Sequence, residues 1–221
     1  MMTEEMRLEM ERGKKRLLDK YIELNKTAEK GGVLFAGSSL MEMFPVEKFA
    51  AEEGLRVTNR GIGGTITDEL LTNIGPCILT LEPSVLFINI GTNDLSIPER
   101  PISQVMENYD RILNRVEEAL PGVRIVMMAY YPVNPDAAPD YMKPVLQIRS
   151  NAKLLEANKA VEALAAKHHA RYINVNAPIT DAEGRLRAEY TIEGMHIREE
   201  GYRAIWPLVK EVMMEEMRAV K

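Results

Sequence analysis

Short apolar runs alternate with longer amphipathic segments along this 221-residue chain. Each run is bounded by turn residues and has the length of a strand that is buried on both faces. The strongest run, Val85-Leu86-Phe87-Ile88-Asn89-Ile90, ends at Gly91. The pattern predicts five strands, at residues 33–36, 56–59, 85–90, 123–129 and 171–175.

Apolar residues at helical spacing predict the elements between and around these strands. We expect helices at residues 3–30, 102–120, 147–167 and 199–219. Residues 68–81 begin like a helix but are interrupted at Gly75-Pro76, and the Pro-rich residues 130–141 are predicted to be a loop. Alternating strands and helices favour an α/β fold, here a flavodoxin-like three-layer α/β/α sandwich with a five-stranded parallel sheet. We expect one domain over residues 1–221, with residues 3–30 as an N-terminal helical extension.

The turn after the first predicted strand places two hydroxyl groups, on Ser38 and Ser39, behind Gly37. A serine at this position is a good helix N-cap. It is also well placed to be a nucleophile, because open parallel sheets put their chemistry at the carboxyl ends of the strands. The second interpretation requires a base, an orienting carboxylate and oxyanion donors from elsewhere in the chain.

Three histidines are the candidates for the base. His168 and His169 lie at the predicted end of a helix, where a cationic side chain interacts favourably with the helix dipole, and we assign them that role. His196 lies in a loop before the last helix, three residues after Glu193. On this spacing alone, His196 is equally well explained as a solvent-facing capping residue and as a catalytic base.

The loops after the second and third strands contain the candidate oxyanion donors. The glycines at residues 61–64 are suited to a tight turn with positive φ, and equally to presenting the bare N–H of Gly64 to an oxyanion. Asn93 and Asp94 are typical of helix caps and Asx turns. The Asn93 amide could also point at the same place as the N–H groups of Gly64 and Ser39, and the three donors would then form an oxyanion hole.

Composition and the remaining motifs exclude several classes of function. The net charge of -5, without a basic block, argues against a nucleic-acid partner. No phosphate-binding glycine motif occurs, and we expect no cofactor. No His or Cys cluster has metal-ligand spacing, so we expect no metal site, and a cation between Asp68 and Asp94 is favoured less than acyl transfer. Cys77 is expected to be small and half-buried.

The N-terminus lacks the features of a signal peptide, and no apolar run approaches the length of a membrane span. We therefore expect a cytoplasmic protein without membrane insertion. Apolar residues of the N-terminal helix and Met213, Met214 and Met217 are expected to pack in the core, with a homodimer as the alternative.

Four stretches resemble, in the same order, the sequence blocks of the SGNH hydrolases, also called GDSL-type esterases and lipases. They are Phe35-Ala36-Gly37-Ser38-Ser39, Asn59-Arg60-Gly61-Ile62-Gly63-Gly64, Gly91-Thr92-Asn93-Asp94 and Glu193-Gly194-Met195-His196. The resemblance implies the same sandwich fold over one SGNH-hydrolase-like domain. It also implies roles for individual residues: Ser39 as nucleophile, His196 as base, and Gly64 and Asn93 as oxyanion donors.

The chain departs from the family pattern at three positions. Ser38 and Thr65 each occupy a place where the family often has Asp, and Glu193 replaces the Asp that normally precedes the histidine by three residues. Glu193 either accepts the Nδ1 proton of His196 or leaves this task to a backbone carbonyl.

The resemblance implies a serine esterase that hydrolyses small acyl esters, such as acetyl esters of carbohydrates, through Ser39, His196 and Glu193. Two alternatives stay open: a catalytically weak carbohydrate- or acyl-binding domain, and an acyltransferase to a sugar or alcohol. In the loop at residues 130–141, Tyr131 and Asn134 are predicted to contact a polar leaving group.

Overall fold

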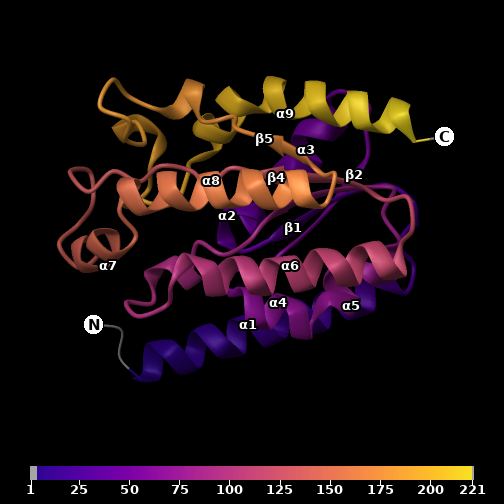
Figure 1. The fold of residues 1–221 in the computed structure, drawn as a ribbon, viewed down its shortest axis with the longest axis horizontal. Helices are drawn as coiled ribbons and strands as arrows, with labels where there is room; N and C mark the ends of the chain where they lie inside the picture. The colour runs from indigo at the N-terminus through magenta and orange to yellow at the C-terminus, as the bar shows by residue number, and fades with distance from the viewer. Residues whose placement is uncertain (1–3, 221) are drawn as a thin grey trace.

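A five-stranded parallel sheet lies between two layers of helices in the computed structural model, which describes residues 4–220 (Figure 1). The strands are β1 (Val33–Gly37), β2 (Val57–Gly61), β3 (Val85–Asn89), β4 (Arg124–Met128) and β5 (Arg171–Ile173). Their order in the sheet is β2-β1-β3-β4-β5, and every neighbouring pair is parallel. This is the flavodoxin-like order, and the predicted fold is confirmed.

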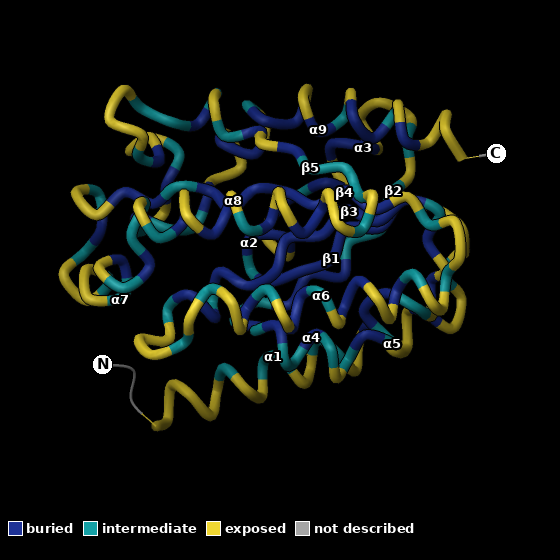
Figure 2. The backbone as a smooth tube through the Cα atoms, viewed as in Figure 1, coloured by how far each residue is buried: buried dark blue, intermediate teal, exposed yellow. Residues whose placement is uncertain are grey.

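The central strands have apolar residues on both faces because helices cover the sheet on both sides. All five residues of β1 and of β3 are buried. Phe35 and Phe87 are paired in register and stack with ring centroids 4.6 Å apart in the core under α9, whereas Leu34 and Leu86 belong to the core on the other face. Figure 2 shows the buried strands inside layers whose outer surfaces are exposed.

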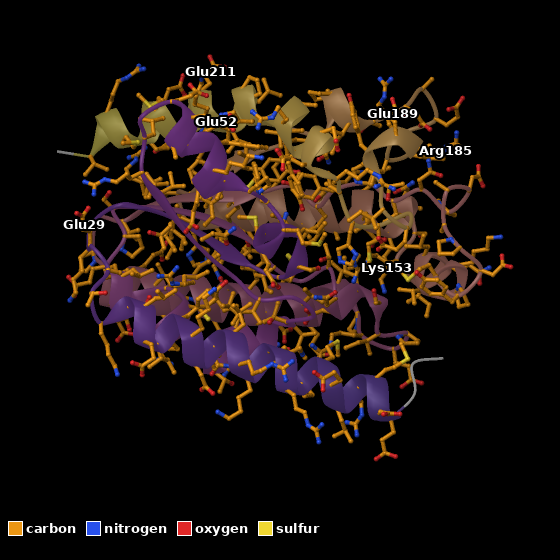
Figure 3. All side chains as sticks on the ribbon, turned by 180° about the vertical axis from the view of Figure 1, so that it is seen from behind. Glu29, Glu52, Lys153, Arg185, Glu189 and Glu211 are labelled. Carbon is orange, nitrogen blue, oxygen red and sulfur yellow. The ribbon has the colours of Figure 1, made fainter. Side chains whose placement is uncertain are left out.

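Helices from both halves of the chain form each layer. One face is covered by α1 (Glu4–Asn25), α4 (Thr67–Thr72), α5 (Ile74–Cys77), α6 (Ile102–Ala119) and α8 (Asn151–Lys167). The other is covered by α2 (Ser39–Glu42), α3 (Val46–Glu52) and α9 (Glu199–Ala219). The remaining helix is α7 (Lys143–Ile148), and the 3-10 turns are η1 (Leu79–Leu81), η2 (Asp94–Ser96), η3 (Ala177–Ile179) and η4 (Ala188–Tyr190). Charged side chains such as Glu29, Glu52 and Glu211 lie on the outside (Figure 3).

The structure corrects several predicted boundaries. The helix predicted at residues 147–167 is two helices, because Ser150 adopts an extended conformation and its hydroxyl caps α8 by accepting from the Lys153 N–H. The first helix ends at Asn25 instead of residue 30, and α2 and α3 were not predicted. The segment is broken into the short helices α4 and α5, but the break is at Asn73, and Gly75 and Pro76 lie inside α5, where a proline is tolerated because the first turn of a helix leaves its N–H groups without a helical partner.

The structure also tests the predicted burial of Cys77 and of the methionines near the C-terminus. Cys77 is fully buried instead of half-buried, and burial raises the pKa of its thiol to about 12. Met213 lies in the core, whereas Met217 is exposed. Within residues 4–220, the helices are too short or too polar to cross a membrane.

Candidate active site

Ser39 is the first residue of α2, and Ser38 separates it from Gly37 at the end of β1. The chain can turn here because Gly37 has a φ of 151° and lies so close to β3 that a Cβ atom would be 2.0 Å from the carbonyl oxygen of Asn89. Ser38 takes the N-cap position and is fully buried, whereas Ser39 is partly exposed. Of the two hydroxyls, that of Ser39 is therefore the one at the surface.

His196 and Glu193 lie beside Ser39, although the serine and the histidine are 157 residues apart in the chain. The Oγ atom of Ser39 is 3.0 Å from Nε2 of His196, and Oε1 of Glu193 is 2.5 Å from Nδ1. Burial alone would raise the pKa of Glu193, but the hydrogen bond and charge interaction with His196 outweigh it and lower the pKa. The carboxylate is therefore ionised at neutral pH and accepts the Nδ1 proton.

The loop that contains the histidine is held in place at both ends and in the middle. Thr191 and Ile197 form an antiparallel bridge, and the Thr191 hydroxyl accepts a hydrogen bond of 2.8 Å from the Gly194 N–H. Gly194 has a φ of 92°, and a Cβ atom there would be 2.6 Å from the Asn134 carbonyl oxygen. Glycine at this position lets the loop pack closely, and Glu193 is then within hydrogen-bond distance of Nδ1 of His196.

The loop after β2 lies directly against Ser39. A Cβ atom at Gly63 would be 3.7 Å from the Cβ of Ser39 and 2.8 Å from Oε2 of Glu42, and this carboxylate accepts the Gly63 N–H at 2.5 Å. Sequence reasoning missed Glu42. Its position three residues after Ser39, which places both on one face of a helical turn, was the available signal.

Helix α1 covers the same loop from the other side. Gly64 has a φ of 73°, and a Cβ atom there would be 3.0 Å from Sδ of Met10 and 3.1 Å from Cε of Lys14. The hydroxyl of Tyr21 donates to the Gly61 carbonyl oxygen at 2.8 Å. The segment expected to be a helical extension therefore supports one of the predicted site loops.

Asn93 has its side-chain amide held in one orientation by two neighbours. Its Nδ2 donates to the Thr65 carbonyl oxygen at 3.0 Å, and its Oδ1 accepts from Nη2 of Arg149 at 2.8 Å. A carbonyl only accepts and a guanidinium only donates, so the amide cannot be flipped without losing both hydrogen bonds. Sequence reasoning also missed Arg149, which lies in the break between α7 and α8.

The carboxylates of Asp68 and Asp94 bind an arginine of the same chain. Nη1 of Arg100 is 2.7 Å from a carboxylate oxygen of each. Asp94 is fully buried and also accepts from the Thr67 hydroxyl at 2.6 Å. The position considered for a divalent cation is therefore occupied by a guanidinium, and the group links α4 to the loop after β3.

Tyr131 and Asn134, predicted to contact a leaving group, are buried in the loop after β4. Tyr131 is 2% exposed and packs edge-on against Tyr202. The Asn134 amide donates to the Leu186 carbonyl oxygen, and its oxygen accepts from the N–H groups of residues 136 and 137. These positions give both residues a structural role, and they lend no support to the predicted substrate contact.

The other two histidines lie where they were expected, at the end of α8. The ring nitrogens of His168 are 2.7 Å from an oxygen of Asp110 and 3.0 Å from one of Glu117. His168 therefore joins α8 to α6 and has no contact with the residues around Ser39.

Residues 36–204, most of the chain, match the model of the GDSL-like Lipase/Acylhydrolase family. This chain belongs to that family. The matched span contains Ser39, Gly64, Asn93, Glu193 and His196, and leaves out α1. The GDSL-like acylhydrolase is therefore an enzyme of a class that acts on ester bonds.

Solved structures share the fold of this GDSL-like acylhydrolase over nearly its whole length. A Streptococcus pneumonia protein whose name refers to platelet activating factor has a TM-score of 0.83 and 29% identity, with 92% of this chain and 94% of that chain covered. A GDSL-like lipase from Bacteroides thetaiotaomicron VPI-5482 has a TM-score of 0.75 and 20% identity, with 90% and 97% covered.

A more distant likeness is to an acetylxylan esterase from Geobacillus stearothermophilus, solved as a catalytic mutant. Its TM-score is 0.64 and its identity 15%, with 85% of this chain and 96% of that chain covered. At this identity the likeness shows a common fold. Among curated proteins, none matches this acylhydrolase.

Proposed function

We propose that this acylhydrolase is a serine esterase that hydrolyses small acyl esters through an acyl-enzyme on Ser39. The observation that carries the proposal is the continuous line of contacts from Ser39 Oγ to His196 Nε2, at 3.0 Å, and from His196 Nδ1 to Glu193 Oε1, at 2.5 Å. A nucleophile, a base and a carboxylate that orients the base are in hydrogen-bond contact, which is the arrangement needed for nucleophilic acyl transfer.

In the first step, His196 Nε2 removes the proton of the Ser39 hydroxyl as Oγ attacks the carbonyl carbon of the ester. Glu193 stabilises the imidazolium that forms and keeps the Nδ1 proton in place. The tetrahedral intermediate collapses, the bond to the alcohol oxygen breaks, and the alcohol leaves with the proton from Nε2. An acyl group is now bound to Ser39.

In the second step, water attacks the acyl-enzyme by the same route. His196 takes a proton from the water, the second tetrahedral intermediate collapses, and Ser39 leaves with that proton. The products are a carboxylic acid and the free enzyme. In both steps we assign the negative oxygen to the N–H groups of Ser39 and Gly64 and to the Asn93 amide.

Two observations support these donors. The loop with Gly63 and Gly64 packs directly against Ser39. The Asn93 amide uses one of its two hydrogens on the Thr65 carbonyl oxygen, which leaves the second hydrogen for a substrate.

For the substrate, we infer a small acyl group, for example an acetyl ester of a carbohydrate. The acetylxylan esterase with a similar fold is an example of this chemistry on such a framework. Hydrolysis rates for a series of p-nitrophenyl esters from acetate to decanoate test the inference, because a rate that rises with chain length would contradict it.

The proposed nucleophile is tested by comparing two neighbouring serines. Ser39→Ala should lose at least about 10³-fold in kcat on p-nitrophenyl acetate and should not react with a fluorophosphonate probe. Ser38→Ala is the matched control and should still be labelled. Labelling of the Ser39→Ala protein, or hydrolysis by it at the wild-type rate, would show that Ser39 is not the nucleophile.

The contact between Glu193 and His196 favours an active enzyme over a binding domain with a decayed triad, because the longer side chain does reach the imidazole. Adding a sugar or alcohol acceptor to the same assay separates a hydrolase from an acyltransferase. A hydrolase gives the free acid as its main product, whereas an acyltransferase gives the new ester.

A further inference from the structure

Arg149 is a buried cation that donates to three uncharged acceptors. It is 3% exposed. Its Nε donates to the Ser96 hydroxyl at 2.7 Å, its Nη1 to Sδ of Met195 at 2.8 Å, and its Nη2 to Oδ1 of Asn93 at 2.8 Å. Buried charges are usually paired, because removing an ion from water is costly. Among the described residues 4–220, however, no carboxylate forms an ion pair with Arg149.

The three acceptors belong to two of the loops that contribute to the proposed chemistry. Asn93 and Ser96 follow β3, and Met195 precedes His196. Arg149 comes from a third segment, between α7 and α8, and donates to both loops. One guanidinium with a rigid set of donors therefore links these two loops.

Arg149 determines which end of the Asn93 carboxamide faces the guanidinium. Because a guanidinium has only donors, Oδ1 of Asn93 must face it, and the NH₂ group must point away. One hydrogen of that group bonds to the Thr65 carbonyl oxygen. Without Arg149, the Thr65 carbonyl oxygen would be the remaining partner that orients the amide, and the amide could rotate more easily.

The positive charge of Arg149 also affects how strongly the Asn93 amide donates a hydrogen bond. Burial lowers the pKa of Arg149 to about 10, so the group is still charged at neutral pH, and the carboxylates of Asp94 and Glu193 act on it through space. A cation behind the amide oxygen polarises the amide and strengthens its N–H as a donor. Negative charge that forms in front of the amide is stabilised by the same field.

We propose that Arg149 is a positioning residue of the oxyanion hole: it orients the Asn93 carboxamide and places a positive charge behind it. This inference rests on the proposed acyl-transfer function. It goes beyond that function because it assigns a role to a residue that contacts neither Ser39 nor His196 directly.

A double-mutant cycle between Arg149 and Asn93 tests the proposal, with kcat and KM for p-nitrophenyl acetate as the readout. We expect Asn93→Ala to lower kcat about 10²- to 10³-fold and Arg149→Met to lower it about 10- to 10²-fold, with KM nearly unchanged. In the Asn93→Ala background, Arg149→Met should have little further effect on kcat. A residue that only stabilised the fold would lower kcat by the same factor in both backgrounds, and that result would overturn the proposal.

Two further variants keep the test decisive. Arg149→Lys retains the positive charge and should keep more of the wild-type kcat than Arg149→Met does. If Arg149→Met does not fold, Arg149→Lys takes its place in the double-mutant cycle. Equal losses for Lys and Met, when both are folded, would contradict the electrostatic part. Arg124→Met is the control: it breaks an ion pair with Glu216 at the opposite end of the sheet and should leave kcat unchanged. If the Ser39→Ala protein kept its activity in this assay, the proposed esterase function would be wrong. That outcome differs from equal kcat losses for Arg149→Met in both backgrounds, which would overturn only the role of Arg149.

Discussion

Glu193 occupies the place where the family pattern has Asp, and shortening it is expected to lower activity. Its Oε1 is 2.5 Å from Nδ1 of His196. Loss of one methylene in Glu193→Asp would withdraw the carboxylate by about 1.5 Å, beyond hydrogen-bond range. The loop cannot simply follow, because Gly194 already packs against the Asn134 carbonyl oxygen. In this chain, the residue that the family pattern normally has would therefore weaken the proposed triad.

Glu193→Gln separates the charge of the side chain from its shape. Glutamine keeps the length and an oxygen that accepts from Nδ1, but it cannot stabilise the imidazolium. Two opposite charges about 4 Å apart at an effective dielectric constant of about 20 interact by ~4 kcal/mol. The side chains of His196 and Glu193 are 24% and 13% exposed, and water reduces this value. With about 3 kcal/mol remaining, kcat should fall about 10²-fold.

The assay is the initial rate of p-nitrophenyl acetate hydrolysis at neutral pH, with far-UV circular dichroism to check that each variant is folded. Glu189→Gln is the matched control, since Glu189 is an exposed carboxylate paired with Arg187 on the surface (Figure 3). We expect the control to keep the wild-type rate, and both Glu193 variants to lose at least about tenfold. Wild-type activity in Glu193→Gln would refute the assignment of this carboxylate to the triad.

Two further predictions concern stability. The pKa of Glu193 is lowered in the folded protein because the hydrogen bond to His196 outweighs burial, so the Glu193 carboxylate stabilises the fold fully above pH 4.5, and this stabilisation is lost as the pH falls through the folded-state pKa. In urea titrations, the stability advantage of wild type over Glu193→Gln should therefore shrink below pH 4.5. A stability difference that stayed constant below pH 4.5 would contradict this prediction. Asp94→Ala removes a fully buried carboxylate from Thr67 and Arg100 and should cost about 3–5 kcal/mol of unfolding free energy, whereas Asp140→Ala, at an exposed pair with Lys143, should change nothing measurable.

The sequence alone determined the framework of this enzyme. Apolar runs such as residues 85–90 predict buried strands because a strand covered on both faces must be apolar throughout, and that signal is local. Their alternation with helices predicts the parallel sheet, whose strand ends bring distant loops to one edge. The family resemblance selected Ser39, Gly64, Asn93, Glu193 and His196 as candidates without any coordinates.

The tertiary structure decided which side chains touch. Whether Glu193 reaches His196 depends on how closely Gly194 packs, and whether Asn93 is fixed depends on Arg149, more than fifty residues away in the chain. Tyr131 and Asn134 look like rim residues in a Pro-rich loop, yet Tyr131 is buried against Tyr202 and the buried Asn134 donates to the Leu186 carbonyl oxygen. Spacing reports which face of an element a residue occupies, but a hydrogen bond between distant segments depends on packing to within a fraction of an ångström, and no local pattern encodes that.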